Sequence, residues 1–193
     1  MKISLIVTAI STAAAFAMPA AAADFTGPRA EVHLGWDQLG VDHDGLKGHE
    51  DNVAYGFGVG YDMPLGSMLV GGVEANLDFS EISRTDRGTA NGTAYSAHVK
   101  AGRDIDISAR FGTMIGDNFL LYGKAGYSNS RLKVRTTAGS ASLGYSENND
   151  GLRLGAGGEF AFGQAFAKVE YRYTNYESGF DRDQVFLGLG WRF

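Results

Sequence analysis

From residue 29 onward the chain alternates apolar residues with polar residues or glycines, with the period of two that is typical of β-strands. In the last such run, Val185, Leu187 and Leu189 alternate with Phe186 and Gly188. The pattern predicts eight strands, at 30–37, 53–61, 69–79, 104–112, 119–127, 152–160, 165–173 and 185–193. Each run is near the ~10 residues that a tilted strand needs to cross a bilayer. An even number of strands suits a closed up-and-down barrel, which leaves no strand edge open.

The two faces of these strands differ in bulk, and this difference indicates which face lies outside. The apolar face carries large side chains such as Trp36 and Phe57, whereas the other face is mostly glycine with a few long charged residues. A soluble lipocalin also has eight alternating strands, but its apolar face lies inside. The interior of an eight-stranded barrel is only just wide enough for side chains, so the bulky face fits on the outside. On the polar face, Gly56, Gly58 and Gly60 leave room for long neighbours. We therefore predict an all-β fold: an eight-stranded antiparallel up-and-down transmembrane β-barrel.

The connections between the predicted strands alternate in length. Those after the second, fourth and sixth strands are short, at 62–68, 116–118 and 161–164. Those after the first, third, fifth and seventh strands are predicted to be longer polar loops, at 39–52, 80–102, 128–151 and 174–183. Short periplasmic turns and long extracellular loops are typical of outer-membrane barrels, so we expect both ends of the mature chain to be periplasmic.

The first residues have the layout of a secretory signal peptide. Lys2 is followed by a mostly apolar stretch at 3–16 and by small residues at 20–23. This order predicts cleavage after Ala22 or Ala23. A membrane anchor is the alternative, but the stretch is short and no basic stop-transfer cluster follows it. We expect a signal peptide at 1–23 and one barrel domain at 24–193, located in the cell outer membrane.

Composition excludes several functional classes. The chain has no Cys, which rules out disulfides, thiol catalysis and lipid attachment at a cysteine. Its net charge is −5, and because Lys2 is the only charge in the predicted signal peptide, the mature chain is more negative still. A negative balance argues against nucleic acid as a partner. No cofactor is expected.

Charged residues on the inward face form the first candidate site. Buried charges must pair with each other or coordinate something, so we predict a structural network of ion pairs that fills the lumen. A narrow ion path through the same charges is the functional alternative. We expect Glu31 and Arg192, near the start of the first strand and the end of the last, to pair. The predicted inward charges are Glu31, Asp37, Glu74, Asp78, Asp104, Asp106, Arg110, Lys124, Arg153, Glu159, Lys168, Glu170, Arg172 and Arg192.

A second candidate site is a group of basic residues beyond the fifth strand. Arg131, Lys133 and Arg135 share one face of an extended segment by the period of two. Arginine suits the geometry of phosphate, so these residues are possible contacts for lipopolysaccharide, with ordinary solvated loop charge as the alternative. Further basic residues are expected nearby, at Arg84, Arg87, Lys100 and Arg103.

Metal and catalytic chemistry have weak support in the sequence. The first long loop could offer ligands to a divalent cation, but their spacing fits no standard calcium loop. The candidate ligands are Asp42, His43, Asp44, His49, Glu50 and Asp51. Ser96 and His98 share a face of an extended segment, but no acidic residue that could orient the histidine is evident nearby. We therefore expect neither a metal site nor an enzyme.

Short motifs along the whole mature chain resemble a known family. They are Arg110–Gly112, Tyr122–Gly126, Glu170–Tyr173 and the end Gly188–Phe193. With these motifs the chain resembles the small outer-membrane barrels of the OmpA-transmembrane and opacity-protein type, a porin-family group. The resemblance is to the barrel domain only. The resemblance implies that the terminal Phe193, with Trp191 two residues before it, is an assembly signal read by the outer-membrane assembly machinery.

These observations predict a non-enzymatic outer-membrane barrel that contributes to envelope integrity and the cell surface. Its expected partners are outer-membrane lipid, lipopolysaccharide and the assembly machinery, and we expect a monomer. A narrow porin-like channel for small solutes or ions stays open as an alternative. So does a surface adhesin or host-factor binder that acts through the extracellular loops.

Overall fold

The computed structural model describes residues 24–193 apart from 44–45, 81–82, 91–92, 139–140 and 178–179, and it describes side chains outside 39–51, 81–101, 132–143, 145–147 and 178–180. The predicted signal peptide at 1–23 lies outside the described residues. The strands are β1 (Gly27–His43), β2 (Leu46–Pro64), β3 (Leu69–Ser80), β4 (Ser83–Ala90), β5 (Thr93–Ile115), β6 (Phe119–Ala138), β7 (Ala141–Phe162), β8 (Ala165–Tyr176) and β9 (Phe180–Arg192).

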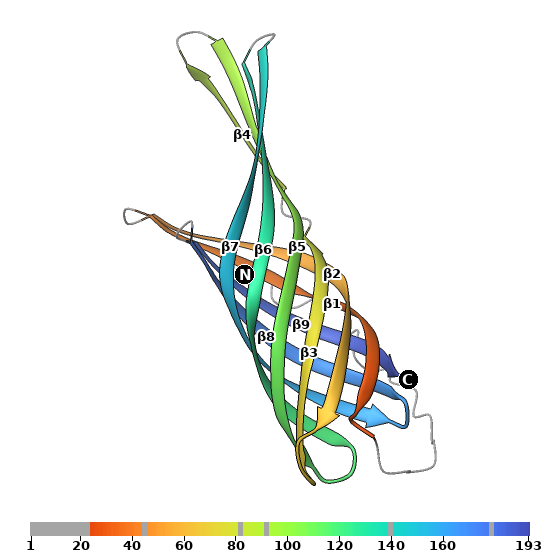
Figure 1. Ribbon diagram of the computed structural model, residues 1–193. Coiled ribbons are helices and arrows are strands. Elements are labelled where there is room, and N and C mark those ends of the chain that lie inside the picture. Colours follow the sequence, from red (N-terminus) through yellow and green to blue (C-terminus); the bar gives the residue numbers. More distant parts are fainter. Residues whose placement is uncertain (1–23, 44–45, 81–82, 91–92, 139–140, 178–179) are drawn as a thin grey trace, which may run out of the picture.

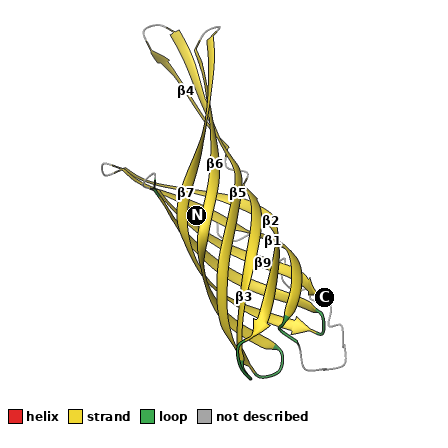
Figure 2. Ribbon diagram, viewed as in Figure 1, coloured by secondary structure: helices red, strands yellow, loops and turns green. Residues whose placement is uncertain are grey.

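Eight of these strands close into an antiparallel barrel (Figures 1 and 2). Neighbours in sequence pair with each other from β5 to β9 and from β1 to β3, β1 pairs with β9, and β3 pairs with β5. The pairing of β3 with β5 closes the ring and leaves β4 outside it, hydrogen-bonded to the upper part of β5. The predicted eight-stranded up-and-down barrel is confirmed.

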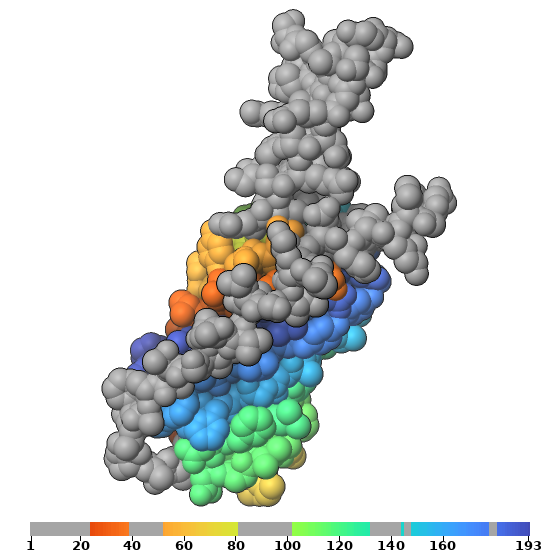
Figure 3. All heavy atoms as spheres, turned by 180° about the vertical axis from the view of Figure 1, so that it is seen from behind, coloured from red at the N-terminus to blue at the C-terminus, as the bar shows by residue number. Residues whose placement is uncertain are grey.

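Large apolar side chains cover the outer wall of the barrel. Val32, Leu154 and Leu189 are 64%, 49% and 65% exposed, and the other bulky apolar residues of the alternating runs point outward with them. Figure 3 shows β1 and β2 (red to orange) beside β8 and β9 (blue) on one continuous wall. Apolar residues outside and charges inside are the reverse of a lipocalin, so the lipocalin alternative is wrong.

The two ends of the barrel differ in shape. At one end, called the turn end, short connections follow Pro64, Ile115 and Phe162. Gly116 and Gly163 have φ angles of +65° and +68° there, a conformation that residues with a Cβ atom rarely adopt. The start of β1 and the end of β9 also lie at the turn end, where the Phe193 N–H donates to the Pro28 carbonyl at 3.0 Å. Within the described residues, no helix is long and apolar enough to cross a membrane.

At the opposite end, called the hairpin end, the expected long loops are mostly strand. β5, β6 and β7 continue far beyond the barrel and rise above it in Figure 1, with β4 along the edge of β5. The prediction of loops at 39–52, 80–102, 128–151 and 174–183 is therefore wrong for most of these residues. A strand that lies outside a bilayer need not alternate apolar and polar residues, so the apolar alternation that marks the spanning strands ends while the backbone ladder continues.

Candidate functional site

The barrel interior holds a dense set of buried charges. Among the described residues, eight Arg and Lys side chains and nine Asp and Glu side chains are buried, each with 5% exposure or less. All fourteen charges predicted to face inward are in this set, together with Arg29, Asp62 and Arg182, which the prediction did not include. The full set is Arg29, Glu31, Asp37, Asp62, Glu74, Asp78, Asp104, Asp106, Arg110, Lys124, Arg153, Glu159, Lys168, Glu170, Arg172, Arg182 and Arg192.

Asp62 organises the charges nearest the turn end. Its Oδ2 atom accepts hydrogen bonds from Arg29 Nε at 3.0 Å, from Arg110 at 2.8 Å and from Arg192 at 3.1 Å. Glu159 accepts from two of the same residues, Arg192 and Arg110. Two carboxylates thus hold three guanidinium groups from β1, β5 and β9 together across the interior.

The middle of the lumen is a ring in which lysines and glutamates alternate. Lys124 Nζ lies 2.5 Å from Glu74 and 2.7 Å from Glu170. Lys168 Nζ lies 3.2 Å from Glu170 and 2.6 Å from Glu31. Arg29 continues the ring by contacting Glu31 at 3.0 Å and Glu74 at 2.5 Å, and so connects it to the cluster at the turn end.

Arginines bridge the acids nearer the hairpin end. Arg153 donates to Asp106 at 2.6 Å and to Asp104 at 2.8 Å. Arg182 donates to Asp104 at 2.6 Å and, through two nitrogens, to both oxygens of Asp37. Such two-pronged contacts between guanidinium and carboxylate are the strongest and most directional of ion pairs.

His33 lies where the middle ring meets this upper group. Its Nε2 atom is 2.5 Å from Asp78 Oδ1 and its Nδ1 atom is 3.3 Å from Glu31 Oε1. Arg172 donates to the second oxygen of Asp78 at 2.8 Å and also contacts Glu170. Arg153 links this group to the acids nearer the hairpin end, because its Nη1 atom lies 3.8 Å from Asp78 Oδ2, so the ion pairs run without a break from the turn end to the hairpin end.

Small and aromatic residues complete the filling of the interior. The inward glycines of β2 leave the space that the network occupies: a Cβ atom on Gly58 would lie 3.1 Å from Glu31 Cγ, and one on Gly60 would lie 3.0 Å from the Arg29 guanidinium. Below the charges, an apolar cluster at the turn end packs Phe25, Val70, Leu120, Tyr122, Ala161 and Phe166. The Arg192 guanidinium lies over the rings of Phe25 and Phe166, at 5.2 and 4.8 Å.

One expected contact differs in the structure. Glu31 and Arg192 do not form the predicted pair, because Glu31 lies beside Gly190 in the ladder while Arg192 lies beside Arg29, one step nearer the turn end. Arg192 therefore reaches Asp62 and Glu159. Asp62 was assigned to a turn, although it continues the inward alternation of the β2 glycines, and that alternation could have identified it.

Several of the basic residues beyond the barrel fall on one face of the extended hairpins by register. Lys100 pairs with Lys133, and His98 pairs with Arg135. Arg87 pairs with Ser96, which shares a face of β5 with His98 and Lys100. Arg84 pairs with Val99, which lies on the opposite face. Directly opposed residues of an antiparallel ladder share a face. Of the acidic residues of these segments, Asp86 and Glu147 belong to the opposite face, whereas Asp150, which pairs with Asn129, belongs to the same face as Arg131. Arg131 itself is half-buried, and the side chains of Lys133 and Arg135 lie outside the described ones.

The candidates for metal binding and catalysis lie outside the described side chains. Where the side chains are described, no group of three or more His, Asp or Glu could hold a metal ion. The undescribed candidates are the possible ligands Asp42, His43, Asp44, His49, Glu50 and Asp51, and the pair Ser96 and His98. Trp191 and Phe193 lie on the outer wall at the turn end, 45% and 72% exposed.

An apolar outer wall around a charged, filled interior defines a transmembrane β-barrel. The sequence matches the family model for the outer membrane protein beta-barrel domain over residues 7–193, and the chain belongs to this family of the cell outer membrane. No curated protein sequence matches it significantly.

Solved barrels share this fold at low sequence identity. Ail, the attachment invasion locus protein of Yersinia pestis, matches with a TM-score of 0.56 and 18% identity over 86% of this chain and 99% of that chain. Neisserial surface protein A matches with a TM-score of 0.58 and 16% identity over 87% of this chain and 98% of that chain.

Proposed function

We propose that the protein is a non-enzymatic outer-membrane barrel that contributes to envelope integrity, with a lumen closed by its own ion pairs. The observation that carries the proposal is the unbroken network from Asp62 at the turn end to Asp37 at the hairpin end. Most charges in that network are held by two or three partners, and moving one would leave others buried and unpaired, at a cost of about 3–5 kcal/mol. This energy opposes the opening of a path for solutes.

The barrel shape also supports an orientation. Short turns are periplasmic and long hairpins extracellular in barrels of this kind, so the turn end, with both mature termini, faces the periplasm. In this arrangement the signal peptide exports the chain, Phe193 and Trp191 present the assembly signal, and the barrel works as a monomer.

The basic residues that share one face of the extended hairpins support a role at the cell surface. In the proposed orientation, Arg131, Lys133 and Arg135 project outside the cell on the same side of the ladder as Lys100. Lipopolysaccharide carries phosphates at this level, and clustered basic residues recognise phosphate. No nucleic-acid partner is proposed.

Adhesion is the second candidate function, and the length of the extended hairpins favours it. The related fold of Yersinia pestis Ail was solved in complex with a heparin analogue, sucrose octasulfate. Sulfated glycans are therefore the ligand class with which to test adhesion by this chain.

The envelope role can be tested in a strain that lacks the protein. We expect such a strain to admit large hydrophobic antibiotics, and the wild-type gene to restore the barrier. A variant with both Lys133→Gln and Arg135→Gln should restore the antibiotic barrier only in part. Arg84→Gln, which changes a residue on the opposite face of the hairpins, should restore the barrier fully. An unchanged barrier in the deletion strain would contradict the envelope role, and loss of binding of cells to immobilised heparin would support adhesion instead.

A further inference from the structure

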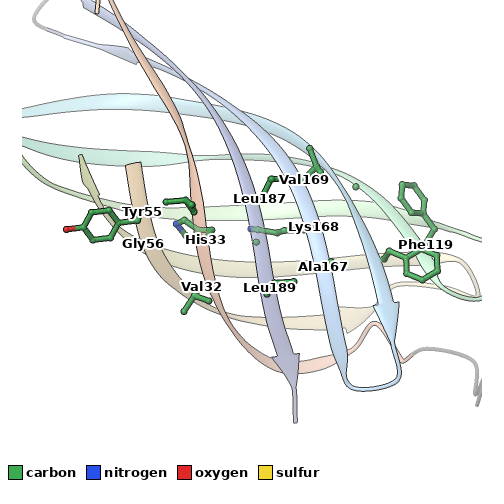
Figure 4. A pocket seen from close by; sticks show the side chains of 14 residues that line it. Val32, His33, Tyr55, Gly56, Phe119, Ala167, Lys168, Val169, Leu187 and Leu189 are labelled. Atoms are coloured by element: carbon green, nitrogen blue, oxygen red, sulfur yellow. The ribbon is translucent and has the colours of Figure 1, made fainter. Parts of the chain in front are cut away.

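A groove crosses the outer wall of the barrel in its turn-end half (Figure 4). It encloses about 890 Å³ and runs across the strands, from Tyr55 on β2 to Phe119 on β6. Most of its lining is apolar, and the central part comes from Val32, Leu34, Ala167, Val169, Leu187 and Leu189.

The register explains why the wall is hollow here. One row of outward residues joins Leu34, Leu187 and Val169, and the next row joins Val32, Leu189 and Ala167. Toward β7 the first row reaches Gly158, beside Val169, and the Phe119 ring lies over this glycine, 2.7 Å from where a Cβ atom would stand, so the groove ends there against Phe119. In the second row, the short side chain of Ala167 leaves space in the same region. Rows of bulky residues with small residues beside them leave a channel between them.

The shape of the groove selects a thin, linear ligand. Alternate outward residues on a strand are about 7 Å apart, so the space between two rows is narrower than the roughly 10 Å of a helix with its side chains. From β2 to β6 the groove crosses five strand spacings, or about 24 Å at 4.8 Å each. These dimensions suit one extended hydrocarbon chain and exclude a helix of another protein.

The chemistry of the groove points the same way. Of the three ionisable residues in its lining, His33 and Lys168 are 4% and 3% exposed and direct their polar atoms to Asp78 and Glu31 inside the barrel, whereas Tyr55, 46% exposed, lies at the β2 end of the groove. Away from Tyr55 the groove therefore offers an occupant contact mainly with carbon. Because this wall faces the membrane, lipid chains surround it.

A second hollow at the turn end suits the other part of a lipid. It encloses about 350 Å³ and is lined by Asp24, Thr26, Gly163, Gln164, Arg192 and Phe193. Gly163 and Gln164 form the turn between β7 and β8, and Arg192 ends β9, so this hollow belongs to the same sector of the wall as the groove. Its carboxylate and amide groups lie where a bilayer places headgroups.

We propose that the groove binds one acyl chain of a phospholipid whose headgroup lies at the turn end. The assignment rests on the outer-membrane location of the family and not on the proposed envelope role. The two walls of the groove would add van der Waals contacts with the chain that a flat lipid-facing surface lacks, and the headgroup would set its direction.

The test counts phospholipid that stays with the purified protein. Wild type and two variants are folded with dipalmitoyl-phosphatidylethanolamine, exchanged into detergent and examined by native mass spectrometry. Ala167→Phe fills the groove. Ala156→Phe makes the same change on the outward face of β7, at a position outside the groove lining, where Ala156 pairs with Tyr171. A shift in gel mobility on boiling establishes that each variant is folded.

We expect wild type and Ala156→Phe to keep one lipid per barrel, and Ala167→Phe to keep about tenfold less, because the phenyl ring removes the van der Waals contacts between the acyl chain and the groove. Retention should persist with dipalmitoyl-phosphatidylglycerol and disappear with dihexanoyl-phosphatidylethanolamine. The assignment would be overturned by equal lipid retention in all three proteins or by the absence of lipid on the wild type. It would also be overturned if retention depended on the headgroup and not on the length of the acyl chains. None of these results bears on the antibiotic barrier.

Discussion

Arg192 provides a sharp test of the ion-pair network, because its sequence-based partner and its structural partners differ. In the structure it contacts Asp62 at 3.1 Å and Glu159, while Glu31 contacts Arg29 and Lys168. Arg192→Met removes the guanidinium but keeps an apolar stem against Phe25 and Phe166. Removing one partner of a buried pair costs about 3–5 kcal/mol.

The lower end of that range is expected for Arg192→Met. Asp62 keeps Arg29 at 3.0 Å and Arg110 at 2.8 Å, and Glu159 keeps Arg110 at 3.3 Å, so neither carboxylate loses all its partners. We predict a loss of about 3 kcal/mol in the free energy of unfolding. Glu159→Gln should couple to Arg192→Met by about 1–3 kcal/mol, as groups in contact do. Glu31→Gln should couple to it by less than about 0.5 kcal/mol, because Glu31 and Arg192 share no partner.

The assay is reversible urea unfolding in phospholipid vesicles, followed by the fluorescence of Trp36 and Trp191. Two double-mutant cycles, one pairing Arg192 with Glu159 and one pairing it with Glu31, use the same assay and the same lipid. A coupling between Glu31 and Arg192 as large as that between Glu159 and Arg192 would refute the arrangement of charges at the turn end.

Three further perturbations test the wall, the interior and assembly. Leu154→Arg should cost about 2–4 kcal/mol, since a lipid-facing side chain 49% exposed becomes charged; normal assembly compared with Leu154→Met would show that the assigned face is wrong. Gly58→Ala should destabilise the barrel by about 1–3 kcal/mol because its Cβ would meet Asn76 and Glu31, whereas Gly123→Ala, whose Cβ meets Gly155 O at 3.8 Å, should unfold like wild type. Deleting Phe193 should lower the yield in outer-membrane fractions on immunoblots, and a wild-type yield would remove the support for an assembly signal.

The sequence predicts the barrel because the bilayer imposes a strict rule on the spanning residues. Every outward position must be apolar and every inward position must fit a narrow interior, so period-two alternation carries both the fold and the facing. Val185 to Leu189 show the rule plainly. The rule does not apply to residues beyond the membrane-spanning part, and the segments at 83–90 and 93–101 carry no comparable alternation.

The sequence also predicts which charges lie inside but not how they pair. Alternation fixes the face of a residue, whereas a partner depends on the stagger between strands that are distant in sequence. Arg172 and Asp78, for example, lie on β8 and β3 and meet across the lumen rather than within a ladder. Arg182 was assigned to a loop, because β9 begins earlier than its apolar pattern does.

Conductance in a planar bilayer tests the central claim, a lumen closed by paired charges, most directly. The wild-type barrel, folded and inserted singly, should show no steady conductance across the voltage range that the bilayer tolerates. A Glu159→Gln, Arg192→Met variant, which loosens the turn end, should show at most brief openings. Steady, large conductance through the wild-type protein would contradict the closed lumen and favour the narrow channel.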